Sequence, residues 1–187
     1  MLQPTGSVVE IAHVVEDLDA AIAQFIEFWG AGPFYTAQMT FPNGHRYRGE
    51  EAPMAIDVGF GFSGGLLIEL VQPMEGDRSV FSEALTARGP GFHHIVRREA
   101  FEEGAARYVR AGFDKALELT TAFGERTILF DTTALNGGFL EVTDLNITFG
   151  PDAVKALRKH SQKLFERGGG RLLAPFSRRG LDRKSVV

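Results

Sequence analysis

Two histidines and two glutamates occupy matching places in two similar stretches of this 187-residue sequence. His13 and His94 each lie in a short apolar stretch, and Glu69 and Glu141 lie inside the apolar runs GLLIELVQP and GGFLEVTDL. A carboxylate among apolar residues is costly to bury unless it is paired, hydrogen-bonded or bound to a cation. Two imidazoles and two carboxylates can chelate a divalent metal ion and leave one or two positions for water or substrate. The sequence therefore predicts one metal site that both stretches share.

Each residue could instead have a purely structural role, because a lone strand histidine is more often a hydrogen-bonded core residue and a lone strand glutamate usually faces solvent. The matching positions of the four residues in the two halves favour one metal site over four unrelated structural roles. His93 stands beside His94, and alternation along a strand points neighbouring side chains to opposite faces. His94 aligns with His13 in the repeat, so we assign the ligand role to His94, with His93 on the other face or capping the strand.

The elements that must position these residues follow one plan in both halves. Residues 9–30 and 91–112 each read as an apolar strand followed by an amphipathic helix. Strand-like runs then follow at 33–41, 52–60 and 65–73, and again at 113–121, 125–133 and 137–145. We predict an α+β fold with two tandem βαβββ modules at 7–73 and 91–147. A linker at 74–90 includes the helical run SVFSEALTAR, and a helical, basic C-terminal extension covers 148–187.

Composition narrows the chemistry further. The chain has no cysteine, so a metal must be held by nitrogen and oxygen ligands. The N-terminus lacks a signal-peptide pattern and no long apolar run is present, so we expect a cytoplasmic protein without membrane contact. The net charge is -4, but half of the Lys and Arg residues follow Gly150. An acidic body without interleaved aromatic residues in the tail argues against nucleic acid, and we expect the tail to pack on a second subunit.

The segments IAHVVEDLDAAIAQF, LLIELVQP, GFHHIV and GFLEV, within residues 7–147, resemble the vicinal oxygen chelate superfamily. This superfamily includes glyoxalase I, methylmalonyl-CoA epimerase, extradiol dioxygenases and bleomycin-resistance proteins, and the likeness is nearest the glyoxalase I and epimerase branch. The resemblance implies paired modules whose curled mixed sheet encloses a metal ion, with His13, Glu69, His94 and Glu141 as ligands. It also implies a homodimer.

The same resemblance implies a metal-dependent enzyme that performs proton transfer, isomerisation, epimerisation or lyase chemistry through a metal-stabilised enolate on a small oxygen-bearing substrate. Glu141 is the expected acid/base. Asp57 is the candidate for a second one, although an outward-facing Asp57 fits the sequence equally well. Zn, Ni, Co, Mn and Fe are all compatible with these ligands. A small-molecule binding protein of the antibiotic-resistance type is the alternative function, and an iron-dependent ring-cleaving dioxygenase ranks below both.

Two further groups of residues bear on the substrate. A segment with His45, Arg46 and Arg48 could form a cationic lip for a carboxylate, or could be a solvated loop. Several phenylalanines near the proposed pocket strands suggest an aromatic or acyl substrate, although core packing explains most of them. These are Phe34, Phe41, Phe60, Phe62 and Phe139.

Overall fold

The computed structural model describes residues 4–41, 45–120 and 125–144, and the predicted C-terminal extension lies outside these ranges. The elements of the described part are β1 Val8–Val14, α1 Leu18–Trp29, β2 Tyr35–Phe41, β3 His45–Tyr47, β4 Glu50–Glu51, β5 Met54–Ser63, β6 Leu66–Pro73, α2 Val80–Arg88, β7 Gly91–Arg97, α3 Phe101–Arg110, β8 Lys115–Thr120, β9 Arg126–Asp131, α4 Thr133–Asn136 and β10 Phe139–Thr143. None of the described helices is long and apolar enough to cross a membrane.

The described strands form one mixed sheet in the order β2-β5-β6-β1-β7-β10-β9-β8-β3-β4. The first strand of each module pairs in parallel with the last, β1 with β6 and β7 with β10. The two modules join where β1 and β7 pair antiparallel. This arrangement confirms the predicted fold of two βαβββ modules that share a mixed sheet.

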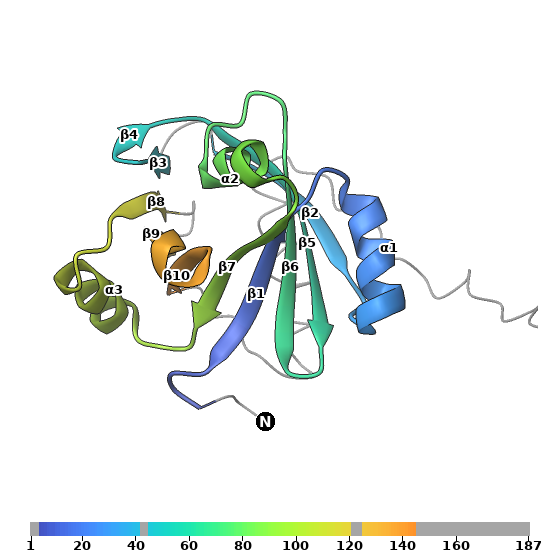
Figure 1. Cartoon of the computed structure of the whole chain (residues 1–187), viewed down its shortest axis with the longest axis horizontal. Helices are drawn as coiled ribbons and strands as arrows, with labels where there is room; N and C mark the ends of the chain where they lie inside the picture. The colour runs from blue at the N-terminus through green and yellow to red at the C-terminus, as the bar shows by residue number, and fades with distance from the viewer. Residues whose placement is uncertain (1–3, 42–44, 121–124, 145–187) are drawn as a thin grey trace, which may run out of the picture.

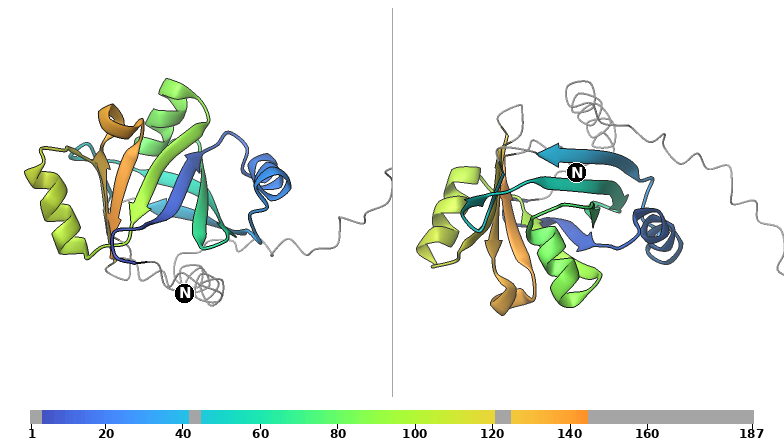
Figure 2. Two further views of the ribbon diagram at one scale, coloured as in Figure 1. Left: turned by 60° about the horizontal axis from the view of Figure 1, so that its bottom comes forward. Right: turned by 90° about the horizontal axis from the view of Figure 1, so that it is seen from above.

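The sheet is strongly curled. Strands β2 and β3 occupy the first and ninth places in the sheet, yet only residues 42–44 separate them in the chain. Because an extended chain covers only about 3.5 Å per residue, the two ends of the sheet must lie close together. Figure 2 shows the resulting curved wall of strands, which has an inner and an outer face.

Helices α1 and α3 cover the outer face at opposite sides of the sheet (Figure 1). The Asp17 side chain caps α1 by accepting a hydrogen bond from the Ala20 amide at 2.9 Å, and Gly30 ends this helix in the left-handed conformation. Leu18 and Ile22 of α1 are buried in an apolar cluster with Ile68 and other residues of the first module. The matching cluster beneath α3 contains Tyr108, Ile128, Phe130, Leu140 and Val142.

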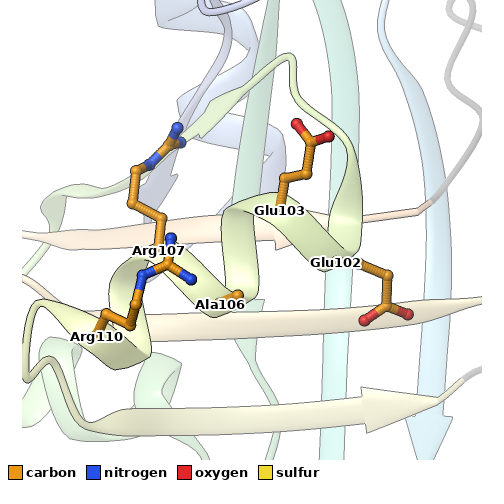
Figure 3. Close-up of a pocket in the computed structure, with 5 residues that line it drawn as sticks. All are labelled: Glu102, Glu103, Ala106, Arg107 and Arg110. Atoms are coloured by element: carbon orange, nitrogen blue, oxygen red, sulfur yellow. The ribbon is translucent and has the colours of Figure 1, made fainter.

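The outward surface of α3 carries a shallow hollow (Figure 3). Its lining residues, Glu102, Glu103, Ala106, Arg107 and Arg110, are all exposed. The acidic residues of this helix stand in its first turn and the basic ones in its last, which favours the helix dipole. The hollow is therefore a charged helix surface, away from the inner face of the sheet.

Helix α2 lies in the predicted linker and packs against β1, β6 and β7. Ser79 begins it with a capping box, in which the Ser79 hydroxyl accepts from the Phe81 amide and the Ser82 hydroxyl accepts from the Ser79 amide. Val80 and Phe81 enter the interior apolar cluster, which also includes the inner-face residues Val14, Ile56, Val58, Val71, Leu117, Leu129 and Phe139. The inner face is thus apolar near α2.

The short hairpin β3–β4 differs from the prediction of a loop. It leaves the first module and pairs with β8 of the second, with Arg46 opposite Glu118 and Tyr47 opposite Leu117. Its turn places Arg48 and Gly49 at positive φ, as a two-residue hairpin turn requires. A three-residue strand gives no readable alternation, so only the tertiary pairing reveals it.

Candidate metal centre

Four ionisable side chains converge on the inner face of the sheet from four neighbouring strands, β6, β1, β7 and β10. Ala12 of β1 lies opposite both Glu69 of β6 and His94 of β7. Val96 of β7 lies opposite both Glu10 of β1 and Glu141 of β10. Residues opposite one another on paired strands share a face, and residues two apart on one strand do too. The pairing therefore brings Glu10, Glu69, His94 and Glu141 together.

The contacts between these side chains are close. Nε2 of His94 lies 3.3 Å from Oε2 of Glu69 and 3.3 Å from Oε2 of Glu141. Glu10, Glu69 and His94 can each offer one ligand atom, all within 4.8 Å of one another. His94 is fully buried and Glu10 is 3% exposed, while the side chains of Glu69 and Glu141 are each 12% exposed.

Burial and mutual repulsion shift the pKa values of this cluster. Burial raises the pKa of Glu10 well above its usual value, and the nearby charges of Glu69 and Glu141 add to the shift. Burial also raises the pKa of Glu69, to about 7, with repulsion from Glu141 adding to it and the attraction of His94 opposing it. Burial disfavours the imidazolium form of His94, but Glu141 and Glu69 outweigh this effect and raise its pKa.

These residues fit a divalent cation. His94 lies within ion-pair distance of Glu69 and Glu141, and one imidazole can balance only part of the negative charge that three carboxylates would carry. The buried Nε2 of His94 also makes no hydrogen bond of acceptable geometry with the described part of the chain. A divalent ion among these oxygen and nitrogen atoms would offset the repulsion and give this nitrogen a partner.

The structure does not bring His13 into this cluster. His13 lies opposite Leu70, whose side chain belongs to the outer cluster beneath α1, and its ring is 5.2 Å from that of Phe25 and 6.1 Å from that of Trp29. Burial, followed by the charge of His94, lowers the pKa of His13. Strand alternation therefore places Glu10, and not His13, on the inner face.

The sequence-based prediction missed Glu10 because it matched His13 with His94 in the repeat. The two helices differ in length, since α1 has 12 residues and α3 has 10. Matching the histidines therefore pairs strand positions that lie at different distances from the start of the helix. Glu10 precedes the N-cap Asp17 by seven residues, and His94 precedes the N-cap Ala100 by six. The rule applied to the other two glutamates, a carboxylate inside an apolar strand, also describes Glu10.

Asp57 lies on the outer face of β5 and away from the cluster. Its neighbours Ile56 and Val58 point into the interior, and Asp57 accepts a hydrogen bond from Nε2 of Gln38 at 3.1 Å. Asp57 is half-buried. The structure thus gives this residue the outward orientation, which the sequence had left open, and does not place it as a second acid/base.

The segment predicted as a cationic lip has other partners. His45 is buried, and its Nδ1 lies 2.8 Å from the carbonyl oxygen of Ala52. Arg48 pairs with Glu83 at 2.6 Å and with Asp131 at 3.0 Å, so its charge ties β3 to α2 and β9. His45 and Arg48 therefore serve these internal contacts, and Arg46 is exposed, with a hydrogen bond from its Nη1 to the carbonyl oxygen of Gly49 at 3.4 Å.

Comparison with known proteins places this geometry in a family. Residues 10–130 match the model of the Glyoxalase/Bleomycin resistance protein/Dioxygenase superfamily. The chain belongs to the vicinal oxygen chelate superfamily. No curated protein sequence matches the chain.

Solved structures share the vicinal oxygen chelate fold at low sequence identity. A hypothetical protein from Bacillus halodurans C-125 is 17% identical, with a TM-score of 0.55 over 75% of this chain and 94% of that one. A methylmalonyl-CoA epimerase from Mycobacterium tuberculosis is 18% identical, with a TM-score of 0.49 over 76% and 91% of the two chains. A Streptomyces coelicolor methylmalonyl-CoA epimerase variant bound to 2-nitronate-propionyl-CoA is 19% identical, with a TM-score of 0.47 over 76% and 97%.

Proposed function

We propose that this chain is a metal-dependent enzyme that moves a proton on a carbon next to a carbonyl of a small substrate, in an isomerisation, epimerisation or lyase reaction. The observation that carries the proposal is the buried group of three carboxylates and one imidazole on the inner face of the sheet. Buried carboxylates at close range destabilise a fold, so their presence together calls for a function. The family membership supports the same class of chemistry.

Glu10, Glu69 and His94 would hold the metal ion, because their ligand atoms lie within 4.8 Å of one another. Oxygen ligands outnumber nitrogen ligands in this group, which favours the harder ions Mn²⁺ and Fe²⁺ among the metals expected from the sequence. When bound, the ion supplies a Lewis acid that stabilises negative charge on a substrate oxygen.

Glu141 is our candidate for the acid/base. Its Oε2 lies 3.3 Å from Nε2 of His94, and its side chain keeps 12% of its surface exposed on the inner face. A carboxylate beside the cation site, yet outside the three-residue group, can accept a proton from a substrate carbon and return it to the same or the opposite face.

The apolar wall next to the cluster supports a substrate with an aromatic or acyl part. Phe60 lies directly opposite Glu69 on the paired strand β5, and Phe62 follows on the same inner face. Both phenylalanines are half-buried, and Phe60 packs against the interior apolar cluster. The carboxylate group and these phenylalanines thus lie side by side on the inner face, the combination that a site for a small amphipathic molecule requires.

The test is deuterium exchange at enolisable positions. The protein is loaded with Mn²⁺ and incubated in D₂O with a panel of α-substituted carbonyl compounds, including thioesters, and the loss of α-hydrogen is followed by mass spectrometry. We expect exchange with at least one class, loss of exchange by more than about 100-fold in Glu141→Gln, and an unchanged rate in the exposed control Glu75→Gln. Metal binding without exchange in any compound would contradict the enzymatic proposal.

A small-molecule binding protein is the second candidate, favoured by the same half-buried phenylalanines beside the cluster. It predicts that ligands bind equally well before and after metal removal by a chelator. The expected homodimer is a separate proposal, which sedimentation of the full chain measures directly.

A further inference from the structure

The two adjacent histidines of β7 form a hydrogen-bonded chain. Nδ1 of His93 lies 2.8 Å from Nδ1 of His94, and Nε2 of His93 lies 3.1 Å from the carbonyl oxygen of Val80 at the start of α2. Both rings are fully buried, and they meet edge to face at 82°. The last atom of this hydrogen-bonded series, Nε2 of His94, faces Glu69 and Glu141.

The Val80 carbonyl oxygen determines which nitrogen donates in each of these hydrogen bonds. A carbonyl oxygen can only accept a hydrogen bond, so Nε2 of His93 must carry the proton that it donates to Val80. A neutral His93 then has a lone pair on Nδ1, and this atom can only accept. The proton between the two rings therefore belongs to Nδ1 of His94, which leaves Nε2 of a neutral His94 with its lone pair.

The surroundings hold His93 in this orientation. Its ring stacks on Phe81 of α2 with centroids 4.6 Å apart, and the ring of Phe139, from β10 of the same module, lies 4.9 Å away. The backbone acceptor is equally fixed, because Val80 is fully buried at the first turn of a helix that a capping box begins. A full set of packing contacts thus fixes both the ring and its partner.

We propose that His93 is a positioning residue that keeps the ring proton of His94 on Nδ1, so that Nε2 of His94 is available as a metal ligand beside Glu10 and Glu69. This inference rests on the proposed metal site and assigns a role to a residue that does not itself touch the ion. Without His93, nothing holds the proton of a neutral His94 on Nδ1, and it can occupy Nε2, which faces the oxygen atoms of Glu69 and Glu141 at 3.3 Å. A proton there competes directly with a metal ion.

Two substitutions separate hydrogen bonding from packing. His93→Phe keeps an aromatic ring between Phe81 and Phe139 but removes both nitrogens. His93→Asn places an amide oxygen near the position of Nδ1 and restores an acceptor for His94. His45→Phe is the matched control, because His45 is also fully buried and bonded to a backbone carbonyl.

The first measurement uses metal-free, full-length protein with ¹⁵N-labelled histidine rings, at an alkaline pH chosen so that the ring nitrogen shifts show one protonated nitrogen on His94. The ring nitrogen shifts of His94 report which nitrogen carries the proton. We expect the Nδ1–H form in the parent, in His93→Asn and in His45→Phe, and the Nε2–H form in His93→Phe. An Nε2–H form in the parent, or no change in His93→Phe, overturns the inference; the parent result stands even if a variant does not fold.

The second measurement is calorimetric titration with Mn²⁺ alone. We expect binding to weaken by about 10–100-fold in His93→Phe and to recover largely in His93→Asn, with His45→Phe close to the parent. Equal affinity in the parent and His93→Phe contradicts the positioning role. If the parent binds no Mn²⁺ while the NMR result holds, the proposed metal site fails and the proton placement by His93 remains.

Discussion

The carboxylate of Glu69 provides a test of the cluster that does not depend on any substrate. The change is Glu69→Gln, which keeps the size of the side chain and removes its negative charge. Nε2 of His94 lies 3.3 Å from Glu69, and the carboxylate is buried among Glu10 and Glu141. The substitution should therefore relieve repulsion in the metal-free protein and weaken metal binding, two effects of opposite sign.

The magnitude follows from the pKa of Glu69. This carboxyl has an ordinary value of 4.5, and burial raises its pKa in the folded protein to about 7. Between pH 4.5 and about pH 7, Glu69 holds a proton in the folded protein that it has released in the unfolded chain. The free energy of unfolding therefore falls as the pH rises through this range. At 1.36 kcal/mol per pH unit, Glu69 lowers the free energy of unfolding by about 3 kcal/mol. This loss is absent below pH 4.5 and complete above pH 7.

The assay is urea unfolding of chelator-treated protein, followed by circular dichroism between pH 4.5 and 8. We expect the parent to lose about 3 kcal/mol more than Glu69→Gln over this range. Glu75→Gln, which changes an exposed carboxylate, should follow the parent curve. Mn²⁺ at 100 times its dissociation constant should restore about 2.7 kcal/mol to the parent at pH 8 and much less to Glu69→Gln. Parallel pH curves for the parent and Glu69→Gln would refute the buried-cluster reasoning.

Other perturbations test the assignment and the packing. Glu10→Gln should weaken Mn²⁺ binding by more than about 100-fold in calorimetry, whereas His13→Gln should leave it within a few-fold, because only Glu10 lies in the cluster; the reverse order would return the ligand role to His13. Gly61→Ala should lower the free energy of unfolding by about 1–3 kcal/mol in urea, because an added Cβ would lie 2.7 Å from the ring of Phe34; unchanged stability would mean that this ring is free to move.

Much of the fold follows from local sequence alone. The strand and helix periodicities gave both βαβββ modules, because an amphipathic segment of either type has one face that must be buried. Helix α2 was readable from SVFSEALTAR, and α1 from its apolar spacing and from Gly30. The hairpin β3–β4 was not readable, because its stability comes from pairing with β8, far away in the chain.

In the candidate site, too, local sequence predicts some features and long-range strand pairing decides the others. The sequence alone indicated that carboxylates in apolar strands mark a site, and the structure brings Glu69, His94 and Glu141 together. Whether Glu10 or His13 joins them depends on which face of β1 is the inner one. That face is decided by the register with β6 and β7, and a shift of one residue would exchange the two side chains.

The adjacent histidines of β7 carry the clearest lesson. Strand alternation predicted that His93 would turn to the other face or cap the strand. The first expectation is wrong, because a register shift where β7 pairs with β1 interrupts the alternation, and His93 packs on the interior residues Phe81 and Phe139. Only the tertiary structure decided the role of His93, because its partner Val80 and its stacking neighbour Phe81 come from α2, which packs against β7. Local residue spacing predicts which face a side chain takes in a regular strand, but strand irregularities and hydrogen-bond partners depend on segments that only folding brings together.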